Sequence, residues 1–264
     1  MQFSVSEALD WMRCQRYWYN RNVVRRSVPP TQTMDDGTYW HELARHALVP
    51  SANTPDPEPL NDAQRAMHAF MPTALAELTR DWDVVEIERP HAIKLGALGA
   101  HTLVGTPDGT VRQRASEALY LLQWKTTASG QPLDLLWDQV RVSWHECAYQ
   151  AMVERDYERS VAGTLLGVWR KLSGAARARG EQSFMLIPLA RTAEQVATAL
   201  AELERVGDMI MLERVGALDL IPNRRSCTTW NSRCQYFGVC YGGRALTDSE
   251  FVQVEERYAP EVAT

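Results

Sequence analysis

The chain of 264 residues is long enough for one large domain or two small ones with a buried core. Its composition, 45% hydrophobic and 23% charged, is that of a globular protein, and no stretch approaches the roughly 18 consecutive apolar residues of a membrane-spanning helix. The formal net charge of −5 argues against a protein that coats nucleic acid through its overall charge. A nucleic-acid site would therefore have to be a local basic patch.

The N-terminus has no basic segment followed by an apolar one, so we expect no secretory signal and a cytoplasmic protein. In a reducing compartment the five cysteines are more often metal ligands, nucleophiles or core residues than disulfides.

Three helices are predicted in the first eighty residues. Ser6 is a candidate N-cap for a helix to about Asn20, Asp36-Gly37 opens a second helix to about Leu48, and Asn61-Asp62 caps a third. Four prolines between the second and third helices predict a surface loop over residues 49–59.

Short β-type runs follow, and helices and strands then alternate. Strands are predicted over 84–88, 102–106, 118–124, 163–169 and 183–189, and helices over 133–155 and 192–214. This order predicts a single α/β domain over residues 1–264, with a mixed central sheet flanked by helices.

The strand at 118–124 continues into two polar residues on one face. Side chains alternate along a strand, so Gln123 and Lys125 emerge on the same side and Trp124 on the other. The preceding predicted strand leads into a turn at Asp108, which would face this pair if the two strands are neighbours. An acid, an oxygen donor and a lysine can form a divalent-metal phosphodiesterase site. The alternative is an ordinary Asp-Gly turn beside a solvated strand end.

Four short segments extend this pattern, in the order Gly37-Thr38-Tyr39-Trp40-His41-Glu42, Gly105-Thr106-Pro107-Asp108, Gln123-Trp124-Lys125-Thr126 and His145-Glu146-Cys147-Ala148-Tyr149. In type and order they resemble the motifs of the PD-(D/E)XK nuclease superfamily, specifically its RecB-like branch of AddB-type and CRISPR-associated iron–sulfur exonucleases. The resemblance covers nearly the whole chain and implies a restriction-endonuclease-like core.

The resemblance also implies site residues. His41, Asp108, Gln123 and the backbone carbonyl of Trp124 would hold Mg²⁺ or Mn²⁺, Lys125 would orient the attacking water and stabilise the phosphate, and Tyr149 would belong to the site. Two departures stand out, because Gln123 replaces the usual acid and His145 the usual glutamine. A glutamine offers an oxygen without charge, which weakens metal binding. The alternatives are a polar residue on a helix face for His41 and half-buried packing for Tyr149.

Four cysteines lie at the two ends of the chain, at Cys14, Cys227, Cys234 and Cys240. Four thiolates suit either tetrahedral zinc or an iron–sulfur cluster. One remote N-terminal cysteine with three C-terminal ones is the arrangement of the iron–sulfur members of the family, so the resemblance implies a [4Fe–4S] cluster held by residues 1–30 and 221–244. The family has a shorter first gap, which makes Cys227 the departure in this set. Cys147 is expected in the core.

A cluster there would join the chain ends and gather a local basic patch. Its arginines would be Arg13, Arg16, Arg21, Arg25, Arg26, Arg224, Arg225, Arg233 and Arg244. Aromatic residues among them could stack on unpaired bases, or pack the two chain ends together. These are Trp11, Tyr17, Trp18, Tyr19, Trp230, Tyr236 and Phe237.

Three functions follow from these observations. The first is a metal-dependent DNA exonuclease acting on single-stranded or frayed ends in recombination, repair or processing, with a partner protein from such a pathway. The second is a nuclease-derived subunit that binds DNA ends but has lost cleavage with the acid at position 123. The third is a zinc-stabilised α/β protein with no nucleic-acid role.

Overall fold

The computed structural model describes residues 1–49, 57–96, 99–128, 132–172, 175, 183–229 and 232–254. The chain divides into two compact units: unit 1 is Met1–Pro30, Ala92–Gly105 and Ala197–Thr264, and unit 2 is Thr31–His91 and Thr106–Val196. Most of the predicted loop at 49–59 lies outside the described residues. Within the described part of the chain, no helix combines the length and apolarity needed to cross a membrane.

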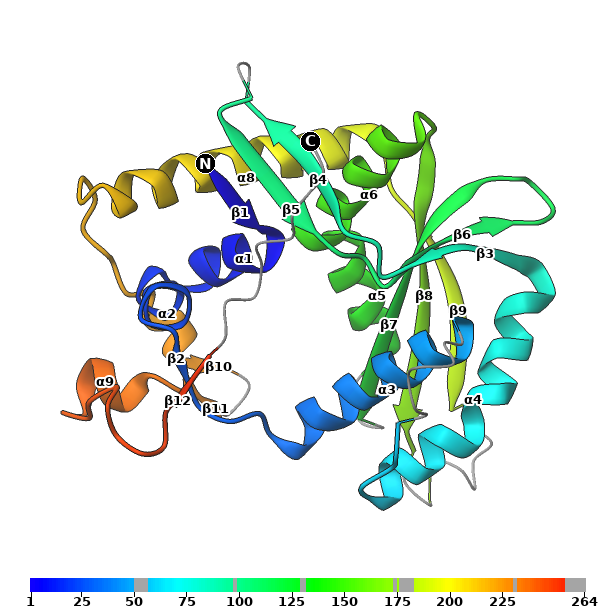
Figure 1. Ribbon diagram of the computed structural model, residues 1–264, viewed down its shortest axis with the longest axis horizontal. Coiled ribbons are helices and arrows are strands. Elements are labelled where there is room, and N and C mark those ends of the chain that lie inside the picture. Colours follow the sequence, from blue (N-terminus) through cyan, green and yellow to red (C-terminus); the bar gives the residue numbers. More distant parts are fainter. Residues whose placement is uncertain are drawn as a thin grey trace. The chain divides into compact units, whose positions relative to one another are not determined.

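A five-stranded mixed sheet forms the centre of unit 2 (Figure 1). Its strands, in spatial order, are β3 (Trp82–Ile87), β6 (Gly109–Gln113), β7 (Leu119–Ala128), β8 (Val161–Lys171) and β9 (Phe184–Ala190). Only β7 and β8 run parallel among these neighbours. A parallel pair needs a crossover connection, which α5 (Leu133–Arg141) and α6 (Trp144–Tyr157) supply. The mixed α/β sheet flanked by helices that the sequence predicts is confirmed.

Helices cover both faces of this sheet. On one face α3 (Gln32–Leu48) and α4 (Asp62–Asp81) pack on the larger apolar cluster, which includes Trp40, Trp124 and Phe184. On the other face α5 contacts alternate residues of β8, Leu166 and Val168. Burying one large apolar side chain contributes roughly 1.5–3 kcal/mol, so the aromatic cluster is a major part of the stability of unit 2.

Trp124 packs directly against the neighbouring strand. A Cβ added to Gly167 of β8 would lie 2.3 Å from Cζ3 of Trp124, well inside contact distance. Any side chain at Gly167 would therefore push the Trp124 ring out of its place, at a cost of about 1–3 kcal/mol for overpacking. Position 167 therefore requires a glycine, because the Trp124 ring leaves no room there for a side chain.

Unit 1 is assembled from the two chain ends and one internal hairpin. Its three-stranded sheet has the order β1 (Gln2–Ser4), β5 (His101–Gly105) and β4 (His91–Leu95). The helical elements are α1 (Val5–Arg13), α2 (Gln15–Trp18), a π-helix over Tyr19–Val23, and most of α8 (Ala193–Arg214). Glu7 of α1 accepts hydrogen bonds from Trp18 Nε1 (3.1 Å) and from Arg214 (2.7 Å). One carboxylate thus links α1, α2 and α8.

The C-terminal part of unit 1 consists of short elements. A 3₁₀-helix (Arg224–Cys227) leads into the hairpin β10 (Thr228–Thr229) and β11 (Ser232–Arg233), and α9 (Phe237–Tyr241) follows. β12 (Val252–Gln253) then pairs antiparallel with β2 (Arg26–Ser27). The two chain ends are therefore adjacent through backbone pairing.

Two predicted helices are each divided in two. The first helix is capped by Ser4, whose Oγ accepts from Glu7 N at 3.0 Å, and it ends at Cys14, where the backbone is extended. The predicted helix at 133–155 breaks at Val142 and Ser143, between α5 and α6. By contrast, Asn61 caps α4 as predicted, with Oδ1 accepting from Gln64 N at 3.0 Å.

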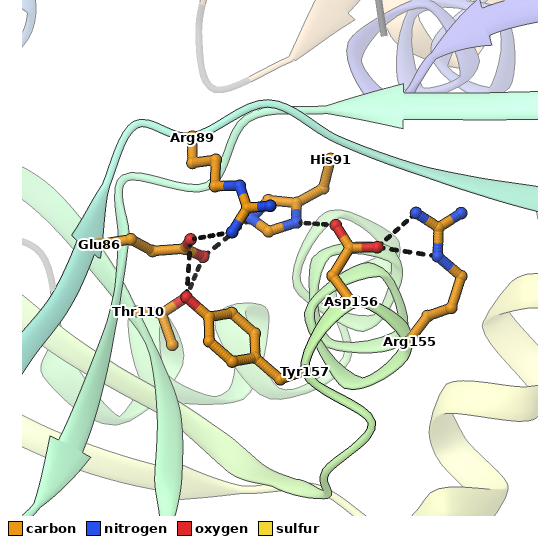
Figure 2. A network of polar contacts seen from close by, with 7 residues as sticks. All are labelled: Glu86, Arg89, His91, Thr110, Arg155, Asp156 and Tyr157. Atoms are coloured by element: carbon orange, nitrogen blue, oxygen red, sulfur yellow. Dashed lines mark hydrogen bonds and ion pairs between the residues drawn. The ribbon is translucent and has the colours of Figure 1, made fainter. Parts of the chain in front are cut away.

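A buried polar network within unit 2 joins β3, His91 and the C-terminal end of α6 (Figure 2). The side chain of His91 is fully buried between two carboxylates, with Nε2 2.9 Å from Glu86 Oε1 and Nδ1 2.7 Å from Asp156 Oδ2. Tyr157 (2.8 Å) and Thr110 (2.9 Å) donate to Glu86, which Arg89 also approaches, while Arg155 contacts Asp156.

This network shifts the protonation of its members. Burial alone would lower the pKa of His91, but Glu86 and Asp156 outweigh burial and raise it above the ordinary 6.5. Burial would raise the pKa of Glu86, and the hydrogen bonds from His91 and Tyr157 instead lower it to about 2. The network therefore favours the charged form of all three groups, the imidazolium of His91 and the carboxylates of Glu86 and Asp156.

We predict that this network makes unit 2 less stable at alkaline pH. A raised pKa in the folded state contributes stability that is complete below pH 6.5 and is lost as the pH rises through the raised value. Urea unfolding from pH 6 to 9, compared between the parent and His91→Gln, measures the effect. The parent should lose free energy of unfolding over this range, and the variant should be weaker at pH 6 with a flatter profile. Parallel profiles would contradict the assignment.

Candidate active site

Asp108 owes its position to a strand that the sequence did not reveal. The sequence left open whether the strand that precedes Asp108 neighbours the Gln123 strand. It does not, because β5 pairs with β1 and β4 in unit 1. Gly109 instead begins β6, which pairs antiparallel with β7 and places Gly109 opposite Leu122. Asp108 consequently lies beside the middle of β7, where its Oδ2 accepts a hydrogen bond from Trp124 N at 2.7 Å.

The other oxygen of Asp108 faces helix α3. His41 Nδ1 lies 3.2 Å from Asp108 Oδ1, so these two predicted site residues are in contact. Burial alone would raise the pKa of Asp108, but the hydrogen bond and charge of His41, the charge of Lys125 and the Trp124 N–H hold it below its usual value. Asp108 is thus an ionised carboxylate within a largely enclosed site.

The three site residues of β7 alternate as predicted. The Trp124 ring lies in the aromatic cluster under α3, 6.2 Å between ring centroids from Trp40. Lys125 is half-buried and close enough to lower the pKa of Asp108 and of His145. Gln123 is 2% exposed, and its Nε2 has no hydrogen-bond partner among the described residues.

Helix α6 adds two neighbouring groups to this site. Burial and then the charge of Lys125 lower the pKa of His145 to about 4, so its imidazole is neutral at neutral pH. The ring of Tyr149 packs on that of His145, with centroids 4.5 Å apart, and Tyr149 is 5% exposed. Tyr149 is therefore a packing partner of His145 in this arrangement.

Two further carboxylates, which the sequence did not single out, surround the site. Glu146 is 1% exposed, and its pKa is raised by burial against the opposing charges of Lys125 and Arg191. Glu88 has a left-handed backbone (φ 47°), lies 3.4 Å from Arg45, and has a pKa raised first by burial and also by Asp108. A charged residue within the otherwise buried stretch of α6 was the available signal for Glu146.

The donors fit a hard divalent cation in their chemistry. Asp108 offers carboxylate oxygens and Trp124 a backbone carbonyl oxygen. Gln123 offers a buried amide, in which a half-turn about the last torsion angle exchanges the positions of Oε1 and Nε2. The atom of Gln123 without a partner is the donor Nε2, which a cation does not satisfy, so Gln123 could bind a metal only through its amide oxygen. Among the described residues no group of three or more His, Cys, Asp or Glu side chains is arranged to hold a metal ion.

The four predicted cluster cysteines line one cavity in unit 1, although the described side chains are not arranged there to hold a metal ion. Cys14, Cys227, Cys234 and Cys240 line one small cavity together with Arg13, Tyr17, Pro222, Asn223, Ser226, Tyr236 and Phe237. Asn223 N donates to Cys14 Sγ at 3.3 Å, and Cys234 N to the Cys227 carbonyl at 2.8 Å. Burial raises the pKa of the Cys234 and Cys240 thiols. Among the described residues that line the cavity there is no histidine or carboxylate, so the donors described there are soft sulfur ligands.

The basic patch of unit 1 is less open than the sequence implied. Arg21 lies 3.4 Å from Asp10, and Arg244 pairs with Glu250. Trp11, Tyr17, Trp18 and Tyr236 are all buried, so these four pack the chain ends, while Tyr19 and Phe237 are partly exposed. Trp230 lies outside the described residues. Arg16, Arg224 and Arg225 are exposed, as are Arg13 and Arg233, which lie over the rings of Tyr17 and Phe237.

Comparison with known proteins was made at the level of sequence families and of structures. The family model of the PD-(D/E)XK nuclease superfamily matches residues 2–241. The chain belongs to this superfamily. Its members generally use divalent metal ions such as Mg²⁺. A solved structure from Eubacterium rectale, described as "Putative exonuclease", is similar to the chain at 12% identity and a TM-score of 0.55, with 93% of this chain and 89% of that chain covered. This likeness concerns the fold. A search of curated proteins found no match.

The cysteine cavity yields a test that does not depend on activity. For the [4Fe–4S] cluster that the sequence resemblance implies, Cys14→Ala, Cys234→Ala or Cys240→Ala should remove broad visible absorption and bound iron from protein purified without oxygen, because each removes one of four soft ligands. Cys147→Ala, which changes a buried cysteine in unit 2, is the matched control and should retain both. If the parent contains stoichiometric zinc and no iron, the site is a zinc site and not an iron–sulfur cluster. If Cys14→Ala retains its full iron content, Cys14 is not a ligand.

Proposed function

We propose that the protein is a metal-dependent DNA exonuclease that hydrolyses phosphodiester bonds at single-stranded or frayed ends, and that it carries a [4Fe–4S] cluster at its joined chain ends. The observation that carries this proposal is the Asp108 carboxylate, held between His41 and the Trp124 N–H beside Lys125 and Gln123. Family membership supports a nuclease, and the four-thiol cavity supports the cluster.

The residues divide the work of hydrolysis between them. Asp108, His41, the Gln123 amide and the Trp124 carbonyl would hold Mg²⁺ or Mn²⁺, which when bound activates water and polarises the phosphate. The Lys125 ammonium is placed to orient the attacking water and to stabilise the charge that develops on the phosphate oxygens. His145 is neutral and adds no positive charge at neutral pH.

The charge balance of the site bears on its activity. Gln123 supplies no negative charge, so Asp108 is the only carboxylate among the proposed ligands. Glu88 and Glu146 lie near enough for Asp108 to raise the pKa of both. A bound divalent cation would favour the ionised forms of both, so we infer that with the metal in place Glu88 and Glu146 supply part of the negative charge that an acid at position 123 would give.

The second candidate is a DNA-end-binding subunit without cleavage. It is favoured by one observation, the neutral and fully buried amide at position 123. In that case the exposed Arg16, Arg224 and Arg225 would bind the strand, and the site in unit 2 would be a relic.

Cleavage of labelled single-stranded and frayed duplex DNA in Mg²⁺ and in Mn²⁺ decides between the two. Asp108→Asn and Lys125→Ala should each lower the rate by about 10²-fold or more, because they remove a metal ligand and the cation at the phosphate. The exposed Asp62→Asn and Lys94→Ala are matched controls and should keep the parent rate. Gln123→Glu should lower the metal concentration needed for half-maximal cleavage.

Each other outcome has a defined meaning. A parent that binds ends but is inert in both metals, with cleavage appearing in Gln123→Glu, would establish the end-binding subunit. Parent-like cleavage by Asp108→Asn or Lys125→Ala would show that the site is misplaced. Unchanged metal dependence in Gln123→Ala would exclude residue 123 as a ligand.

A further inference from the structure

A cleft in unit 2 runs along the outer edge of strand β9. This strand is the last one on its side of the five-stranded sheet, and among the described residues β8 is its only strand neighbour (Figure 1). The cleft has a volume of about 690 Å³, within the range of ligand sites. Its walls come mainly from α4 and from residues 183–188, with Trp137 of α5 on the other side.

Side chains from both faces of β9 line this cleft. Leu186 packs on the aromatic cluster under α3 and α4, whereas Ile187 packs on the apolar cluster under α5. Side chains alternate along a strand, so these two residues point to opposite faces of the sheet, and both belong to the lining. A cleft that touches both faces of one strand must pass its open edge. The backbone of β9 is therefore part of the floor of the cleft.

This open edge presents backbone groups that pair with no other group in the described chain. Arg170 N donates to the Ser183 carbonyl at 2.7 Å, which makes these two residues a hydrogen-bonded pair of the antiparallel β8–β9 ladder. Such pairs alternate with pairs whose N–H and C=O groups point away from the neighbouring strand. The backbone of Phe184, Leu186 and Pro188 therefore faces the cleft. Phe184 and Leu186 offer N–H donors, and all three residues offer a carbonyl oxygen.

An edge of this kind selects an extended polypeptide segment. Edge strands are normally protected by charged side chains, by proline or by a covering element. The sequence of β9 has no charged residue, and Pro188 removes only one donor near its end. The flanking α4 and α5 favour a single segment over a second copy of the chain, because two edges that each lie between such walls are kept apart by them.

The charges of the cleft indicate a basic side chain on the bound segment. Its charged lining residues are Glu77, Arg80 and Asp81, all from α4. Arg80 Nε lies 3.0 Å from Asp81 Oδ2, so these two charges compensate each other. Glu77 is half-buried, and no ion pair is found for it within the described part of the chain. Its carboxylate is thus available to a lysine or arginine of a partner.

We propose that this cleft binds an extended segment of a partner protein, which pairs with β9 as an additional strand and places a lysine or arginine against Glu77. Main-chain hydrogen bonds to Phe184 and Leu186 supply the affinity, and apolar side chains at alternate positions of the segment fill the cleft. This interaction goes beyond the proposed function and does not depend on cleavage of DNA.

The test begins with selection from a displayed library of nine-residue peptides, apolar at alternate positions and with one lysine at a varied position. Peptides should be enriched that bind the parent and not Leu186→Pro. This substitution removes an outward donor and leaves the hydrogen bonds to β8 in place, as Pro188 does two residues later. Leu186→Ala, which keeps the donor, is the matched control and should retain binding. Failure to enrich any such peptide would overturn the proposal.

A scan of the enriched peptide by N-methylation identifies strand pairing. Alternate N–H groups of a paired strand face its neighbour, so methylation at every second residue should weaken binding by about ten-fold or more, and methylation between them should have little effect. Fluorescence anisotropy of the labelled peptide with the parent protein measures both. An equal effect at every residue would exclude pairing with β9.

Glu77→Lys changes a wall of the cleft rather than the strand, which keeps the test valid if Leu186→Pro fails to fold. This variant should lose the lysine peptide and bind the same peptide with glutamate in place of its lysine. Glu194→Lys, at an exposed glutamate in the first turn of α8 in unit 2, is the matched control and should behave as the parent. Equal binding of the two peptides by Glu77→Lys would contradict the charge contact.

Amide hydrogen exchange distinguishes the possible occupants of the edge. In the parent alone, the Met185 and Ile187 amides bonded to β8 should be protected, whereas those of Phe184 and Leu186 should become protected only with the peptide. Protection of the latter two in a monomeric parent would show that the chain itself covers the edge, and protection in a dimer would assign it to a second copy. Either result would overturn the proposal. Peptide binding by a parent that does not cleave DNA would support the cleft and refute the nuclease.

Discussion

The hydrogen bond from Trp124 N to Asp108 Oδ2 is the contact on which the candidate active site depends. Trp124 also belongs to the core of unit 2. Its ring packs among Trp40 and Phe184 and fills the space beside Gly167, which holds the β7 backbone at this point. Burial of the indole therefore determines where the amide points, and the amide determines where the carboxylate lies. His41 completes the clamp from α3. A change that disturbs the aromatic cluster should therefore also displace Asp108.

The electrostatics of the site follow from this placement. Asp108 is buried yet ionised, since His41, Lys125 and the Trp124 N–H together outweigh the cost of burial. Glu146 and Glu88 have raised pKa values, because burial and the charge of Asp108 both oppose their ionisation. A divalent cation in such a site would stabilise the ionised forms of both. With a cation bound, Glu88 and Glu146 would thus add negative charge to that of Asp108 beside the neutral Gln123.

Much of this could be predicted from the sequence, and the failures have local causes. Alternation along β7 correctly separated Trp124 from Gln123 and Lys125, because strand periodicity is strict. Strand β6 was missed, since Gly109–Gln113 is short and follows Asp108 in an Asp-Gly pair typical of a turn, and the antiparallel partner of β7 was therefore not identified. The break at Cys14 has no proline or glycine to signal it. Glu88 and Glu146 become significant only through contacts distant in sequence, which periodicity does not report.

The central claim is that Asp108, held between His41 and Trp124, is the carboxylate that binds the catalytic metal. Binding of Mn²⁺ in the absence of DNA, followed by electron paramagnetic resonance, tests it most directly. The account predicts that the parent binds Mn²⁺ and that Asp108→Asn binds at least ten-fold more weakly, whereas Asp62→Asn, at an exposed aspartate, is unchanged. Equal Mn²⁺ affinity in the parent and in Asp108→Asn would contradict it.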